Sequence, residues 1–373
     1  MTEKTLTNFY FLHSLKGIPN LGVVKIKSVT ENFKSLNEID TSVFRKFNIF
    51  SEVEKIIDNI NNNRYPDEFL KIAERCRDNK IEITTVLDDD YPVNLRNIYD
   101  PPPFLYYKGK LYEKDRYSIG IVGTRYPSDY GRFSCLKIVK ELSAMNIPII
   151  SGMAMGIDFL AHKKCLEHSN LTYAVLGSGI NVIYPKSSKY IYDTIIEQGG
   201  AVLSEFDIDA KPDKVNFPRR NRIISGISLG VVIVESGIRG GSLITAEFTI
   251  DQNRELFAVP GNINSSQSDG CNELLKKNFA KLVTNAEDII SEFRYRIPEE
   301  FLTIRQEKIL KTPELNVFEE NILGKLDFVK PLHIDEISCQ TKMNVSDCLV
   351  NLLTLEFKGL VNQLPGKNFL RNA

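Results

Sequence analysis

The sequence predicts an α/β protein built on a doubly wound, mostly parallel, Rossmann-like sheet. A small helical N-terminal domain and a C-terminal winged-helix domain are expected to flank it. Three observations predict this architecture.

The chain has 373 residues, more than one ordinary domain needs. Short β-branched runs alternate with helical patterns in the middle of the chain, as in βαβ units. Helical periodicity dominates on both sides. We place the domains at residues 1–80, 81–292 and 316–373, with a linker at 293–315.

The composition is that of a globular protein, with 42% hydrophobic and 25% charged residues. The net charge of −1 argues against a fully basic nucleic-acid coat but permits a local basic patch. Residues 1–20 lack a signal-peptide pattern, and no later run approaches the roughly 20 apolar residues that span a bilayer. We therefore expect a cytoplasmic protein without a membrane segment. The six cysteines form no C-x-x-C pair, so we predict reduced thiols and no metal site.

In the first eighty residues, amphipathic stretches at 53–60 and 68–77 predict helices. Gly17 and Gly22 frame a turn that resembles the hairpin of small helix-hairpin-helix domains, or else a structural turn in which glycine supplies positive φ. The prolines between residues 90 and 103 favour extended, connecting chain over a core helix.

The central domain alternates predicted strands with predicted helices. The strands are expected at Ser118–Val122, Pro148–Ile150, Thr172–Leu176, Ala201–Leu203, Gly230–Val234 and Glu255–Val259. The helices are expected at Phe133–Met145, Ile157–Glu167, Lys189–Gln198 and Leu243–Asn253. Right-handed crossovers then place helices on both faces of the sheet.

The C-terminal segment shows three short helical patterns at 317–326, 334–339 and 345–355, followed by a β-like wing. This order predicts a winged helix-turn-helix, with Val345–Leu355 as the second helix of the turn motif. That helix carries few basic residues, so duplex binding, a protein-protein role and intramolecular packing all stay open.

Small residues follow several predicted strands at the edge of the sheet where doubly wound folds bind ligands. They are Gly123-Thr124-Arg125, Ser151-Gly152 through Asp158, Gly177 with Gly179, and Gly237 with Gly240-Gly241-Ser242. Backbone N–H groups in such loops and at helix N-termini favour anions, which predicts a phosphate-bearing ligand. The dinucleotide fingerprint G-x-G-x-x-G and the Walker A loop are both missing, so we expect no cofactor and no ATP hydrolysis.

The densest basic segment runs from Lys211 to Arg222 and contains Phe217. Its lysines and arginines can neutralise phosphates while the ring stacks on an unpaired base. The alternative is a solvated loop with one buried phenylalanine. Beside the glycine-rich loops we favour binding by Lys214, Phe217, Arg219, Arg220, Asn221 and Arg222.

Two features leave room for an enzyme. Gly240-Gly241 through Glu247 resembles the P-G-G-x-G-T-x-x-E signature of nucleoside-monophosphate phosphoribohydrolases, in which the glutamate assists bond cleavage, but Arg239 and Leu243 depart from it. Asp158 and His162 lie four apart and form either an acid-base pair or a helix-opening acid with a buried histidine. No nucleophile motif accompanies them, so we predict no catalytic residues.

In order along residues 91–290, these motifs resemble the DNA-processing protein A (DprA/Smf) family. The resemblance rests on Val122–Arg125, Ser151–Ala154, Gly156–Asp158, Ala161-His162, Gly177 and Gly179, Tyr184-Pro185, Phe217-Pro218, Arg220–Gly226, Gly241–Ala246, Val259–Gly261 and Gly270–Asn272. It implies an extended Rossmann domain that forms a homodimer and binds single-stranded DNA. It further implies a RecA-type recombinase and single-strand binding protein as partners, in natural transformation, with a partner surface near Glu247.

By position, the resemblance assigns phosphate contacts to Gly123, Arg125, Ser151 and Gly152. It makes Lys186 and Lys214 the pocket lysines and Phe217 the base-contacting aromatic, and it matches Arg220 and Arg222 to the arginines of F-P-x-R-N-R. Three residues depart from the family pattern and put a phosphate contact or the dimer edge in doubt: Met155, Ser188 and Phe279.

Overall fold

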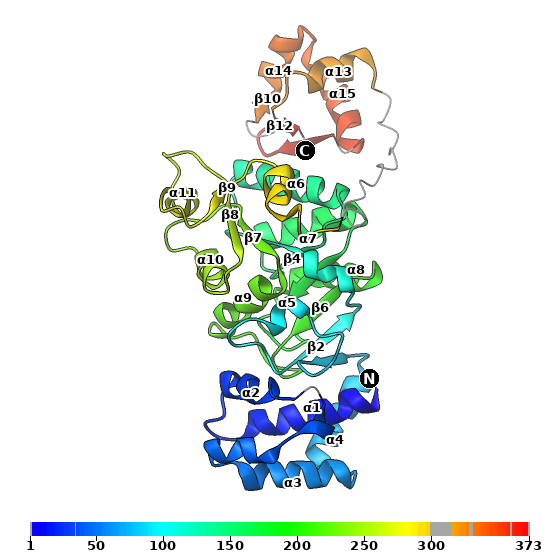
Figure 1. Cartoon of the computed structure of the whole chain (residues 1–373). Coiled ribbons are helices and arrows are strands. Elements are labelled where there is room, and N and C mark those ends of the chain that lie inside the picture. Colours follow the sequence, from blue (N-terminus) through cyan, green and yellow to red (C-terminus); the bar gives the residue numbers. More distant parts are fainter. Residues whose placement is uncertain (1, 34, 299–314, 328–330, 359, 372–373) are drawn as a thin grey trace.

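We describe a computed structural model of the chain (Figure 1), which covers residues 2–298 except 34, and residues 315–371 except 328–330 and 359. None of the helices in this described part has the length and apolar character that a membrane crossing requires.

The N-terminal domain is a helical unit that packs against one end of the central sheet. Its helices are α1 (Glu3–Gly17), α2 (Val23–Thr30), α3 (Phe50–Asn61) and α4 (Asp67–Asp78), so both predicted helices are present. Phe9 of α1 lies 4.9 Å, ring centre to ring centre, from Phe104 of the sheet. In the turn after α1 the residue with positive φ is Asn20 rather than Gly17 or Gly22, which corrects the glycine interpretation of that turn.

The central sheet has nine strands in the order β1-β2-β6-β5-β4-β3-β7-β8-β9. Strands β3 to β9 pair in parallel, and the doubly wound prediction is confirmed. The strands are β1 (Glu82–Thr85), β2 (Phe104–Gly109), β3 (Ile119–Val122), β4 (Ile149–Ser151), β5 (Thr172–Val175), β6 (Ala201–Ser204), β7 (Gly230–Ile233), β8 (Glu255–Ala258) and β9 (Lys281–Leu282).

Strands β1 and β2 were not predicted. They pair antiparallel with each other across a connection that contains α5, and β2 then pairs antiparallel with β6. Pro101 to Pro103 come directly before β2, where proline needs no ladder hydrogen bond, so the run of prolines conceals a strand that begins one residue later.

Helices cover both faces of the sheet, as right-handed crossovers require. One face packs on α6 (Asp129–Ala144), α7 (Ile157–Glu167) and α12 (Ala286–Ile290). The opposite face packs on α5 (Val93–Arg96), α9 (Asn216–Ile227), α10 (Ser242–Asp251) and α11 (Asp269–Lys276). Helix α8 (Lys189–Glu197) contributes to the core that continues into the N-terminal domain.

The central domain extends beyond the predicted boundary at residue 292. Phe293 and Ile297 are both buried in the core beside α6 and α12, because the chain after α12 packs on the face of the sheet, where Phe293 contacts Phe257 of β8. The predicted linker at 293–315 therefore begins too early, and residues 299–314 of it lie outside the described residues.

The C-terminal domain is a winged helix, as predicted. It contains α13 (Val317–Leu323), α14 (Ile334–Thr341) and α15 (Val345–Phe357), with a three-stranded sheet of β10 (Leu332–His333), β12 (Asn368–Arg371) and β11 (Val361–Leu364). Its separate core includes Ile337, Leu352 and Phe369.

Candidate nucleic-acid interface

A cavity of about 510 Å³ opens at the carboxyl ends of the parallel strands, the edge where doubly wound sheets bind ligands. Loops after β3, β4 and β7 meet there with the N-terminal ends of α9 and α10. The residues that matter to its chemistry are Gly123, Thr124, Arg125, Tyr126, Asp158, Tyr184, Lys214, Phe217, Arg220, Asn221, Gly237, Gly240, Gly241 and Ser242. We call this cavity the principal pocket.

Phe217 stands in the wall of the principal pocket, between a cation and a second aromatic ring. The guanidinium carbon of Arg125 lies 5.8 Å from the centre of the Phe217 ring. The Tyr184 ring centre is 5.6 Å away, with the rings tilted by 46°. A side chain on Gly177 would collide with the ring, because its Cβ would lie 2.6 Å from a Phe217 ring carbon. The third glycine-rich loop therefore serves to seat Phe217 and does not line the pocket.

Helix α9, which carries Phe217, was not predicted. The sequence predicts binding by the basic segment from Lys211 without assigning it a helix, yet from Asn216 onward it is helical. Pro218 falls in the first turn, where a missing N–H costs nothing. Arg220, Ile223, Ile224 and Ile227 recur at helical spacing and are all buried, and that periodicity is the signal that could have revealed the helix.

Arg220 forms the floor of the principal pocket. It is almost fully buried and donates hydrogen bonds to the carbonyls of Gly152, at 2.6 Å, and of Val175. Burial lowers the pKa of its guanidinium to about 10, and nearby Asp158 opposes that shift. A Cβ on Gly152 would approach the guanidinium to 2.5 Å, so glycine is needed there for close packing.

The polar groups of the segment that ends β4 and leads into α7 form hydrogen bonds within the protein. The Ser151 hydroxyl donates to the Ile121 carbonyl at 2.6 Å, and the Gly152 and Ala154 N–H groups donate to the Asp158 carboxylate at 3.2 and 3.4 Å. Burial raises the pKa of Asp158 to about 6. Ser151 and Gly152 thus lie behind the pocket wall, supporting it.

Three further predicted residues lie outside the pocket lining. Arg222 is only 2% exposed and pairs with Glu205 at 2.6 Å and with Asp100 at 3.1 Å. Arg219 is exposed and lies 3.4 Å from Glu205. Lys186 is exposed in the short turn Lys186–Ser188 that follows Tyr184 and Pro185.

Sequence reasoning missed two aromatic residues of the principal pocket as ligand contacts. Tyr126 is 73% exposed and Tyr184 is 47% exposed, and both line the cavity. Each is an aromatic residue one or two positions from a residue already singled out, Tyr126 after Arg125 and Tyr184 before Lys186. That adjacency was the available signal.

The features that left room for an enzyme find little support. Glu247 is exposed on α10 and is not among the residues that line the principal pocket. His162 is fully buried with Nδ1 2.7 Å from the Thr172 hydroxyl, and burial together with Arg220 lowers its pKa to about 3. A neutral, enclosed imidazole fits the buried-histidine alternative better than a proton-transfer role.

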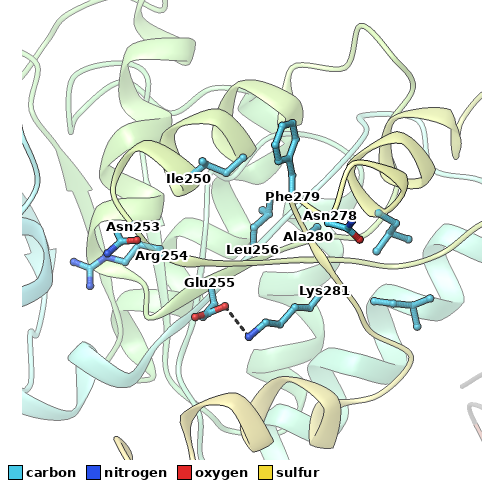
Figure 2. Close-up of a pocket in the computed structure, with 11 residues that line it drawn as sticks. Ile250, Asn253, Arg254, Glu255, Leu256, Asn278, Phe279, Ala280 and Lys281 are labelled. Carbon is cyan, nitrogen blue, oxygen red and sulfur yellow. Dashed lines mark ion pairs between the residues drawn. The ribbon is translucent and has the colours of Figure 1, made fainter.

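A second hollow of about 700 Å³ lies at the β9 end of the sheet (Figure 2). Ile250, Phe279 and Leu282 contribute exposed apolar side chains to it. Lys281 of the edge strand pairs across the hollow with Glu255 at 3.0 Å. The hollow combines an open strand edge with apolar surface, a combination typical of protein interfaces.

Helix α15 of the winged helix is not built for duplex binding. It contains no lysine or arginine between Val345 and Phe357. Instead it exposes Val350, Leu353 and Phe357. Phosphate contacts from this helix are therefore not favoured, since positive side chains supply most of that affinity.

Comparison with known proteins yields consistent matches. Residues 82–294 match the family described as DNA recombination-mediator protein A, and residues 310–367 match the DprA winged helix domain. Protein Smf of Synechocystis is 33% identical over 350 residues, covering 86% of each chain. The DNA processing protein DprA of Streptococcus pneumoniae is 37% identical over 296 residues, covering 78% of this chain and 99% of that protein.

Two solved structures share the fold. The X-ray structure of DNA processing protein A from S. pneumoniae superposes with a TM-score of 0.63 at 33% identity, covering 78% of this chain and 99% of that one. A Helicobacter pylori DNA processing protein A, whose structure addresses its single-stranded DNA binding mode, gives a TM-score of 0.51 at 29% identity. It covers 58% of this chain and 98% of that one.

Proposed function

The chain belongs to the DNA recombination-mediator protein A family, and from that premise we propose that it binds single-stranded DNA and passes it to a RecA-type recombinase. The observation that carries the proposal is the seating of Phe217 between Arg125 and Tyr184 in a glycine-lined pocket. Aromatic faces with adjacent cations suit unpaired bases, which a duplex keeps stacked inside.

We call the part of the lining formed by Arg125, Lys214, Phe217 and Tyr184 the mouth of the pocket. In this proposal its cations bind phosphates and its aromatic rings bind bases. Arg125 and Lys214 neutralise phosphates, aided by backbone N–H groups where Gly241 and Ser242 open α10. Phe217 and Tyr184 stack on bases, worth about 1–3 kcal/mol per base without sequence readout.

The remaining predicted residues take supporting places. Gly123, Thr124 and Asn221 shape the lining, while Lys186 and Arg219 add positive charge at its margin. We propose that Ser151, Gly152 and Arg220 hold the floor, while Arg222 braces α9 outside the lining through its ion pair with Glu205. In this proposal none of the four contacts the strand.

The experiment for this proposal pairs a binding assay with a test of the hydrolase alternative. We expect the purified chain to bind a labelled thirty-nucleotide oligo-dT far more tightly than a duplex of equal length, with affinity falling as salt is added. Incubation with AMP is expected to release no adenine. Adenine release with weak oligonucleotide binding would instead favour the hydrolase, with Glu247 as its first candidate residue.

We further propose that the chain forms a homodimer across the β9 edge of the central sheet. Support comes from the apolar side chains of Ile250, Phe279 and Leu282 around that open edge. Two pockets on one strand would raise apparent affinity through effective concentration. In light scattering, Phe279→Glu is expected to shift the mass toward that of one chain, and an unchanged mass would exclude this edge.

The recombinase step rests on the family alone. We propose that the exposed face of α10 near Glu247 contacts the recombinase, and that the chain displaces single-strand binding protein during natural transformation. Glu247→Lys is expected to leave oligo-dT binding unchanged while slowing recombinase assembly on a strand coated with single-strand binding protein. Equal assembly rates for both chains would place the contact elsewhere.

A further inference from the structure

Beside the principal pocket lies a smaller cavity of about 400 Å³ that the proposed function does not use. Its wall includes Ser128, Tyr130, Glu235, Asn262, Ser265 and Ser268. The two cavities adjoin along two segments of chain. Tyr126 lines the first and Ser128 the second, and Gly237 lines the first and Glu235 the second. Because residues two apart in the chain are separated by at most about 7 Å, parts of the two linings are neighbours.

Tyr126 lies between the two cavities, with its backbone fixed by hydrogen bonds and its ring exposed. The Thr124 hydroxyl accepts a hydrogen bond from the Tyr126 N–H at 3.2 Å, and the Gln267 side-chain amide donates to the Tyr126 carbonyl at 2.9 Å. The backbone is thus fixed from both sides, while the Tyr126 ring remains largely exposed. A strand leaving the principal pocket would pass over that ring.

The chemistry of the smaller cavity suits an uncharged base better than a phosphate. Its lining, within the described residues, holds no lysine or arginine. The Glu235 carboxylate stands in its wall, buried and bonded to the Ser128 N–H at 2.8 Å and hydroxyl at 2.5 Å. A fixed negative charge disfavours a phosphate, whereas hydroxyl and amide side chains can bond a base edge.

One aromatic wall of this cavity is already fixed in place. The Tyr130 hydroxyl donates to the Pro260 carbonyl at 2.6 Å, and the ring is about one-third exposed. A ring held in this way loses little freedom when a base stacks on it. The cavity thus combines a fixed stacking surface, uncharged polar groups and room for a base.

We propose that this cavity is a second base-binding site, which takes the nucleobase next to the one held at Phe217 on the same strand. The inference rests on the proposed single-stranded DNA binding. The strand would place its phosphates toward Arg125 and direct consecutive bases to opposite sides of Tyr126.

The test uses twelve-nucleotide strands that are identical in length and charge. One carries a single thymine among abasic sites, and the other carries two adjacent thymines. For the wild-type chain we expect the second strand to bind about tenfold more tightly, at the lower end of what base stacking supplies. If the protein had only one base site, the strand with two thymines would bind only about twofold more tightly, because either thymine could fill that site.

Ser265→Trp fills the cavity and is expected to reduce this tenfold ratio to about two. Ile263→Trp is the matched control, because it adds the same side chain to an exposed position of the same loop outside the lining, and it is expected to keep the wild-type ratio. Tyr130→Leu removes the stacking ring without filling the cavity and is expected to lower the ratio as well.

A wild-type ratio near two, or a tenfold ratio that survives in both Ser265→Trp and Tyr130→Leu, would overturn the second site. Failure of the proposed function has a different signature, since the wild-type chain would then bind an all-thymine strand no better than a duplex.

Discussion

The mouth and the floor of the principal pocket use the same residue types for opposite purposes. At the mouth, Arg125 and Lys214 are exposed and Phe217 lines the cavity. At the floor, Arg220 of the same basic segment is buried and bonded to carbonyls, and farther along α9, outside the lining, Arg222 is buried and paired with carboxylates. Charge in a sequence thus has no single meaning, since burial decides whether an arginine contacts a ligand or holds the fold.

The largest expected effect is a difference in the free energy of unfolding between a buried and an exposed arginine variant. Arg222→Ala leaves Glu205 buried without its closest cation, and breaking a buried pair costs about 3–5 kcal/mol. Arg125→Ala at the mouth is expected to change the free energy of unfolding by less than about 0.5 kcal/mol. Urea denaturation of both variants measures this difference. Equal losses for the two would remove the distinction between exposed ligand-facing arginines and buried structural ones.

The next effect tests the aromatic part of the mouth. Phe217→Ala is expected to weaken oligo-dT binding by about 1–3 kcal/mol, because one stacking surface is lost. Phe217→Tyr retains a ring and serves as the control, with affinity expected within about twofold of wild type. Fluorescence anisotropy titrations at fixed salt measure the oligo-dT affinity of wild type and of both variants. Similar affinities for all three chains would move the base contact away from α9.

A third effect concerns pH and belongs to the floor. Burial raises the pKa of Asp158 from 3.8 to about 6. The folded carboxyl therefore binds its proton more tightly than the unfolded one, and this contribution to stability is present below about pH 4 and lost as the pH rises to about 6. We expect Asp158→Asn to lack this decline when unfolding is measured across that range. Parallel pH profiles for the two chains would contradict the burial argument.

The smallest effect concerns a single charge at the mouth. Lys214→Ala is expected to weaken oligo-dT binding a few-fold and to reduce the slope of log affinity against log salt by about one. Lys189→Ala, an exposed lysine paired with Asp193 on α8, is the matched control and is expected to leave the slope unchanged. A Lys214→Ala slope equal to wild type would remove Lys214 from the strand's path.

Much of the fold could be predicted from the sequence because the central strands are short apolar runs and several of them are followed by a helical pattern. Helix α7 was predicted with its observed bounds. Helix α9 was missed because its first turn contains Pro218 and its dense positive charge obscures the apolar periodicity of its isoleucines. Strand β2 was hidden by the three prolines before it.

The candidate site was only partly predictable for a related reason. Gly123, Thr124, Arg125, Lys214, Phe217, Arg220 and Asn221 all line one cavity, because the carboxyl ends of parallel strands meet at one edge. Sequence position could not reveal that Ser151 donates to Ile121 or that Arg222 pairs with Glu205. Those contacts depend on helix phase and on partners distant in the chain.

In the proposed function, single-stranded DNA contacts the mouth of the principal pocket. Photocrosslinking of the wild-type chain to an oligonucleotide containing bromouridine, followed by mass spectrometry of the linked peptides, tests this directly. We predict crosslinks at Phe217, Tyr184 or Tyr126, competed away by unlabelled oligo-dT and not by duplex. Crosslinks confined to the winged helix, such as to α15, would contradict the account.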